Sequence, residues 1–93
     1  MGGDAEFDWD SVNVSQLNQH RVVPNEFEQM MLNDPIYLDY QTFADEERYK
    51  VLGATQAGRV LIAVDCPREG RIRAVTAFNA PKLYEQLYWK EHE

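Results

Sequence analysis

Apolar residues follow a helical spacing in the first third of the chain. Val14 and Leu17 lie three residues apart among polar side chains, which is typical of a short amphipathic helix. Asp10 or Ser11 can cap the first turn of such a helix with a side-chain oxygen. The pattern therefore predicts a helix over residues 11–20.

A second helix is predicted to begin at Pro24, because proline suits the first helical position and Glu26 stands where a capping-box acid belongs. Its apolar stripe, at i, i+3 and i+4 spacing, consists of Phe27, Met30 and Met31. The helix should end at Asn33-Asp34-Pro35, since proline cannot continue it.

From residue 36 the hydrophobic period changes to two, which predicts β-strands. The expected strands cover residues 36–40, 47–53, 59–65 and 71–78. Turn sequences separate the last three strands, at Gln56-Ala57-Gly58 and at Arg68-Glu69-Gly70, so the strands should form an antiparallel meander. The segment 60–64 is apolar on both faces, which places it at the centre of the sheet.

A last helix is predicted after Asn79-Ala80-Pro81, because apolar pairs at i, i+4 spacing follow. The chain is therefore predicted to be an α+β protein with a three- to four-stranded antiparallel sheet, two N-terminal helices and one C-terminal helix. Residues 1–6 are Gly-rich and acidic and are expected to form a disordered tail. Residues 7–93 should form a single domain.

Positive charge is concentrated between Arg48 and Lys82, although the whole chain carries a net charge of −7. That stretch has seven basic and two acidic residues, so it carries +5 and the rest of the chain carries −12. Clustered guanidinium groups indicate a site for a phosphate or for a carboxylate-rich partner. A sheet whose exposed face is basic is the alternative explanation.

Cys66 is the only cysteine, which excludes an intrachain disulfide and favours a reducing compartment. The adjacent Asp65 argues against a nucleophilic thiol. The sequence has neither an apolar run long enough to cross a membrane nor the apolar core of an export signal. We therefore expect a soluble cytoplasmic protein without membrane association. Its small size leaves a homodimer or a hetero-oligomer open.

The sequence offers no metal-ligand spacing, no phosphate-binding glycine loop and no serine triad, so no metal or cofactor is expected. Several different short motifs are spread along the chain from Phe7 to about Tyr88. They are Phe7-x-Trp9-Asp10, His20, Pro24 with Glu26, Asp34-Pro35, Glu46-Glu47-Arg48-Tyr49, Gly53, Ala57-Gly58-Arg59-Val60-Leu61, Gly70-Arg71-Ile72-Arg73, Val75-Thr76-Ala77 and Leu87-Tyr88.

In this order and spacing, the motifs resemble the BrnT family of ribonuclease toxins from type II toxin–antitoxin systems. The resemblance implies a RelE-like fold and a metal-independent endoribonuclease that cleaves RNA by attack of the 2′-hydroxyl. It also implies neutralisation by a cognate antitoxin that binds DNA.

Metal-free RNA cleavage requires groups that take a proton, give a proton and stabilise negative charge on the phosphate. Arg73 is the first choice for the phosphate contact. His20, at the C-terminal end of the first helix, is a candidate general acid, because the helix dipole favours an imidazolium there. Tyr88 could stack on a base, and Glu85 could act as a base or orient an arginine. The further candidates for binding RNA phosphates are Arg48, Arg59 and Arg71.

Each of these residues also has a structural explanation. His20 could simply cap its helix, Tyr88 could be a core side chain, and Glu85 could be a solvated surface acid. The arginines could pair with neighbouring carboxylates, in exposed pairs worth under about 1 kcal/mol.

Three positions depart from the family pattern. Asn13 stands where many members carry lysine, Arg21 where glycine is common, and Phe78 where many members carry arginine. Loss of an arginine that contacts phosphate would remove a charge-assisted hydrogen bond worth about 1.5 to 3 kcal/mol. The alternative function is therefore a catalytically silent, acidic BrnT-like module that engages a basic nucleic-acid-handling protein.

Overall fold

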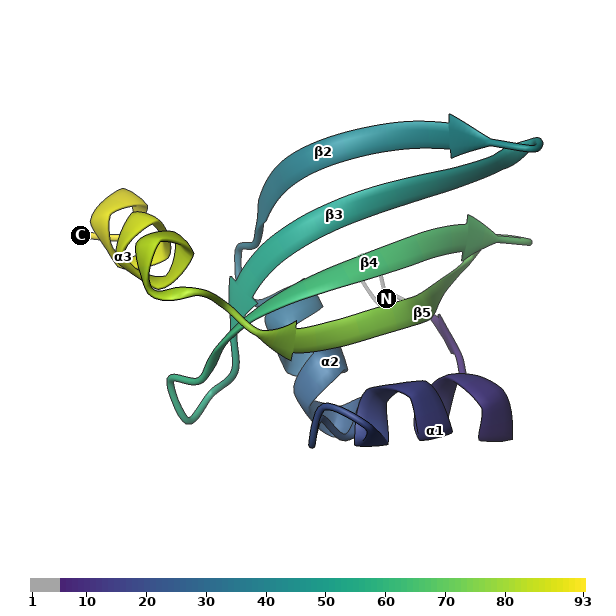
Figure 1. Ribbon diagram of the computed structural model, residues 1–93, viewed down its shortest axis with the longest axis horizontal. Helices are drawn as coiled ribbons and strands as arrows, with labels where there is room; N and C mark the ends of the chain where they lie inside the picture. The colour runs from purple at the N-terminus through teal and green to yellow at the C-terminus, as the bar shows by residue number, and fades with distance from the viewer. Residues whose placement is uncertain (1–5) are drawn as a thin grey trace.

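The computed structural model describes residues 6–93 and consists of a five-stranded sheet with three helices (Figure 1). In chain order the elements are β1 (Phe7–Asp8), α1 (Ser11–Asn18), α2 (Pro24–Leu32), β2 (Ile36–Phe43), β3 (Glu46–Ala54), β4 (Val60–Arg68), β5 (Arg71–Asn79) and α3 (Lys82–Glu91). The predicted α+β class, with two N-terminal helices and one C-terminal helix, is confirmed. Of the tail predicted for residues 1–6, all but Glu6 lies outside the described residues.

The strands are arranged in the order β1-β5-β4-β3-β2, and all neighbours except β1 and β5 are antiparallel. The four predicted strands form the expected meander, and β4 is the central strand of the five-stranded sheet. β1 is an additional strand that pairs in parallel with β5, Phe7 opposite Ile72 and Asp8 opposite Arg73. Two residues are too few to show a strand period, so the sequence pattern could not reveal it.

Local chemistry explains where the elements begin and turn. The Asp10 carboxylate caps α1 by accepting from the Val12 and Asn13 N–H groups. At α2 the Glu26 carboxylate accepts from the Val23 N–H, which fulfils half of a capping box.

Two tight hairpin turns close one end of the sheet. The β4–β5 turn has positive φ angles at Glu69 (53°) and Gly70 (78°). The β2–β3 turn has them at Ala44 (50°) and Asp45 (67°), where no glycine marks the turn in the sequence. We call this end of the sheet the hairpin end. The opposite end, where β3 and β5 end and β4 begins, is called the Arg59 end.

Apolar side chains are buried on both faces of the sheet. One cluster lies beneath α1 and α2 and includes Leu17, Val22, Phe27, Met30, Val51, Leu61 and Ala77. A smaller cluster, on the face covered by α3, consists of Leu52, Ala54, Val60, Ile62 and Tyr88. In Figure 1, α3 lies at the Arg59 end, and the two hairpin turns lie at the opposite end of the sheet from α3.

Candidate nucleic-acid interface

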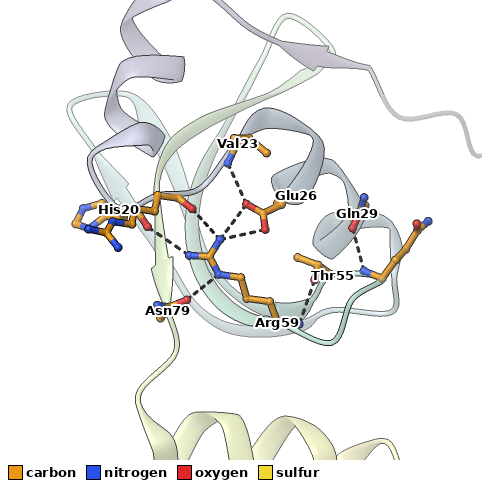
Figure 2. A network of polar contacts seen from close by, with 9 residues as sticks. His20, Val23, Glu26, Gln29, Thr55, Arg59 and Asn79 are labelled. Carbon is orange, nitrogen blue, oxygen red and sulfur yellow. Dashed lines mark hydrogen bonds and ion pairs between the residues drawn. The ribbon is translucent and has the colours of Figure 1, made fainter.

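Arg59 anchors the Arg59 end of the molecule through a dense polar network (Figure 2). Its Nε donates to Asn79 Oδ1 at 2.8 Å, and one Nη donates to both carboxylate oxygens of Glu26, at 2.9 and 3.0 Å. Its guanidinium also donates to the backbone carbonyls of Arg21 (2.8 Å) and His20 (3.4 Å). Arg59 therefore holds together the α1–α2 turn, α2 and the end of β5, and its donors are not directed to an external phosphate.

His20 lies in the same neighbourhood, just after α1. Its imidazole is exposed and its ring centroid is 5.9 Å from that of Phe78, near the end of β5. Arg73 is five residues earlier on β5, which corresponds to about 17 Å of strand. His20 and Arg73, the predicted acid and phosphate ligand, are therefore not brought together within one chain.

At the hairpin end, three arginines from three strands line one pocket of about 250 Å³. Arg48 comes from β3, Arg68 from β4 and Arg73 from β5. Glu46, Cys66 and the first turns of α1 complete the wall. We call this space the arginine pocket. Arg71 lines an adjoining pocket of about 450 Å³ together with Arg68 and Arg73. Of the candidate arginines, Arg48 and Arg73 line this pocket, Arg71 lines the adjoining one and Arg59 lies at the other end of the sheet, while Arg68 also belongs to the group.

Carboxylates accompany these arginines. Arg73 pairs with Asp10 (2.9 Å) and, more distantly, with Asp8 (3.6 Å). Arg48 Nε pairs with Glu46 at 2.8 Å, with both side chains more than 40% exposed. The hydrogen bond from Arg73 holds the pKa of Asp10 below its ordinary value, and the one from Arg48 does the same for the pKa of Glu46. The arginine pocket is therefore a surface of mixed charge.

Within residues 6–93, no ion pair involves Arg68 or Arg71. Both are exposed and flank the β4–β5 turn, where they face each other across the two strands. Their position follows directly from the hairpin, because residues at the last paired position of an antiparallel turn have neighbouring side chains. Arg68 was missed as a candidate because the sequence pattern placed it in a turn rather than at the end of β4.

Tyr88 occupies a core position. It is 2% exposed, its hydroxyl donates to the Asn33 carbonyl at 3.1 Å, and its ring stacks on His92 with 4.0 Å between the centroids. Burial raises its pKa. Tyr88 fastens α3 to the end of α2 and has no free face for a nucleobase. Glu85, on the same helix, is exposed.

Two further titratable groups, both on β4, lie near the arginine pocket. Cys66 is buried, and burial, followed by the nearby Glu46 carboxylate, raises the pKa of its thiol, which makes it a poor nucleophile. Asp65 is 3% exposed, and burial raises its pKa to about 6. Its Oδ2 has no hydrogen-bond partner among the described residues. No local pattern signals this burial, since Asp65 stands as an ordinary polar residue at the end of a predicted strand.

Two of the departures from the family pattern have structural roles here. The buried Asn13 side chain donates to the Asp8 carbonyl (2.7 Å) and accepts from the Asp10 N–H (2.9 Å), so it completes the start of α1. Phe78 packs against the α3-side cluster and contacts His20. Both residues therefore contribute to the fold.

No protein-family model and no curated protein matches the chain. Among residues 6–93, no group of three or more His, Cys, Asp or Glu side chains is placed to hold a metal ion. No helix in the same range is both long and apolar enough to cross a membrane.

Proposed function

We propose that this chain is the toxin component of a type II toxin–antitoxin system, a BrnT-like protein that acts on RNA in the cytoplasm. A DNA-binding antitoxin would neutralise it. The observation that carries the proposal is the arginine pocket, in which Arg48, Arg68 and Arg73 come together from three strands. The order of sequence motifs provides the independent support.

RNA phosphate can compete for these arginines. Exposed ion pairs such as Arg48–Glu46 are weak because water solvates both charges, so an incoming phosphate displaces the carboxylate at little cost. Arginine offers a phosphate two parallel donors, and contacts of this kind give RNA binding its salt dependence. Arg68 and Arg71 extend the same surface along the hairpin.

Cleavage at this pocket would depend mainly on stabilisation of charge. Arg48 and Arg73 would stabilise the negative charge that develops when the 2′-hydroxyl loses its proton and attacks phosphorus, while the P–O5′ bond breaks to leave a 2′,3′-cyclic phosphate and a 5′-oxygen that takes a proton from water. Glu46 and Asp10 are the carboxylates nearest to them and are the available proton acceptors, although the hydrogen bonds from the arginines lower their pKa values and so weaken both as bases. His20 and Tyr88 lie elsewhere, so in this proposal they take no part.

The test is expression of the chain without any partner, followed by measurement of growth and of RNA integrity. We expect growth arrest and RNA fragmentation, both relieved by the double variant Arg48→Gln/Arg73→Gln. The matched control is Lys82→Gln/Lys90→Gln, which removes the same charge from exposed positions on α3. Normal growth and intact RNA at equal protein levels would refute the proposal.

A second candidate is the catalytically silent binding module, in which carboxylates on this chain engage a basic nucleic-acid-handling protein. It is favoured by one observation: the arginine pocket contains no histidine, and His20 contacts Phe78, which is separated from Arg73 by about 17 Å of β5. A salt titration separates the two candidates. Affinity for RNA that falls steeply with salt supports the toxin, whereas no RNA binding at low salt supports the silent module.

A further inference from the structure

The two edges of the sheet are protected very differently. On one side, β1 pairs with the start of β5, and α1 lies along the same strand (Figure 1). On the other side, β2 pairs only with β3, and within residues 6–93 its outer side has no strand beside it. An uncovered strand presents backbone N–H and C=O groups that can pair with another chain.

β2 lacks most of the features with which proteins protect an edge. It is eight residues long and contains no proline, lysine or arginine. All three of its aromatic residues are exposed: Tyr37 (59%), Tyr40 (48%) and Phe43 (69%). Its only irregularity lies between Tyr37 and Asp39, so the following four residues remain in regular register with β3. The edge is therefore accessible to an added strand.

Charge indicates what kind of strand would fit. From Val22 to Glu47 the chain contains no lysine, arginine or histidine. Five acids lie on β2, in its two flanking turns and at the start of β3, namely Asp34, Asp39, Asp45, Glu46 and Glu47. A second copy of this chain would bring the same acids against them, which disfavours edge-to-edge dimers. A basic segment has the complementary charge.

Asp39 lies in the middle of this edge. Its exposed carboxylate accepts from the Tyr40 N–H at 2.8 Å and from the Gln41 amide at 3.4 Å. These are local bonds at the surface, and a lysine or arginine on an added strand can reach the same carboxylate.

From these features, we propose that the outer edge of β2 binds an extended, lysine- or arginine-containing segment of a partner protein, which joins the sheet as a sixth strand. Backbone hydrogen bonds would supply affinity, and Asp39 with the exposed aromatic residues would supply specificity. This proposal does not depend on an RNA-directed activity, because β2 contributes no residue to the arginine pocket.

The experiment uses the full chain and a synthetic peptide of about ten residues in which lysine alternates with valine and threonine. Amide hydrogen exchange, read by NMR, reports on β2 directly. At a peptide concentration of about 1 mM, we expect exchange of β2 amides to slow by about tenfold. A peptide with glutamate in place of lysine should bind at least about tenfold more weakly.

Asp39→Lys should weaken binding of the lysine peptide by about tenfold, because it reverses the charge at the centre of the edge. The matched control is Glu91→Lys, which makes the same charge change at an exposed position on α3 and should leave the affinity within about twofold. Binding without slower exchange in β2 would mean only diffuse attraction to acidic surface and would overturn the proposal, as would no binding at about 1 mM. A homodimer that protects the β2 amides would also overturn it, because the edge would then belong to a second copy.

Discussion

The two ends of the sheet use arginine in different ways. At the Arg59 end, a single guanidinium bonds to the Glu26 carboxylate, the Asn79 side chain and two backbone carbonyls. At the hairpin end, Arg48, Arg68, Arg71 and Arg73 cluster around two pockets, and at most one or two carboxylates accompany each of them. The number and burial of its partners determine whether an arginine stabilises the fold or remains available to a ligand.

Replacement of the arginine at the Arg59 end should give the largest loss of stability. Arg59→Gln leaves the Glu26 carboxylate and the carbonyls of the α1–α2 turn without their donor, so we expect a loss of about 2 to 4 kcal/mol of unfolding free energy. Urea unfolding measures it. Arg71→Gln, at an exposed position of the hairpin end, is the matched control and should change stability by less than about 0.5 kcal/mol. Equal losses in the two variants would remove the distinction between the ends.

The chain should also be packed more tightly at the Arg59 end than at the hairpin end. A Cβ added at Gly53 would lie 2.8 Å from the Met30 carbonyl oxygen, so Gly53→Ala forces β3 and α2 apart and should cost about 2 kcal/mol. At Gly70, in the β4–β5 turn, an added Cβ meets no atom within 4 Å.

Gly70→Ala therefore costs only the strain of its positive φ of 78°, about 1 kcal/mol. Thermal unfolding of the two variants tests whether Gly53→Ala lowers stability more than Gly70→Ala does. A smaller loss for Gly53→Ala than for Gly70→Ala would show that α2 is not tightly packed on β3.

Ionisation of the buried Asp65 carboxyl should lower the free energy of unfolding at neutral pH. Its pKa rises from an ordinary 3.8 to about 6 in the folded chain, so the fold favours the protonated carboxyl. The stability that the protonated Asp65 carboxyl contributes is fully present below about pH 3.8 and is lost as the pH rises through about 6.

Asp65→Asn removes the buried charge and should stabilise the chain by about 1 to 2 kcal/mol at pH 7, with little change at pH 3.5. Urea unfolding at the two pH values provides the measurement. The same gain at both values would assign the effect to packing instead of ionisation.

The smallest effect on stability is expected for Arg73. Its side chain is 17% exposed, but its partner Asp10 is 47% exposed and keeps its hydrogen bonds to the start of α1 when the arginine is lost. Arg73→Gln should therefore lower the unfolding free energy by less than about 1 kcal/mol, although the proposed function requires that it weaken RNA binding. A large loss of stability would show that Arg73 is part of the structural framework, like Arg59.

Much of the fold could be predicted because its signals lie close together in the sequence. The Asp10 carboxylate caps α1 by accepting a hydrogen bond from an N–H only three residues away. Pro24 begins α2, Asn33 follows its last residue, and Gly70 lies in the β4–β5 turn, so each of these boundaries is marked locally. The change of period at residue 36 separates the helices from the sheet. These features determine elements and class, since each depends on neighbours within a few residues.

The candidate site could be predicted only in part, because its contacts join distant positions. Arg59 resembled the other arginines in the sequence, and only the folded chain brings it to Glu26, Asn79 and the turn after α1. In the same way, the pairing of Arg73 with Asp10 depends on β1 lying beside β5.

The sequence by itself determined the helices, the four-stranded meander and the concentration of arginines in its second half. Tertiary structure alone decided which arginine holds the fold, which carboxyl is buried, and which edge of the sheet stays open. The physical reason is that local spacing sets backbone conformation, whereas burial and charge pairing depend on residues that meet only after the sheet has formed.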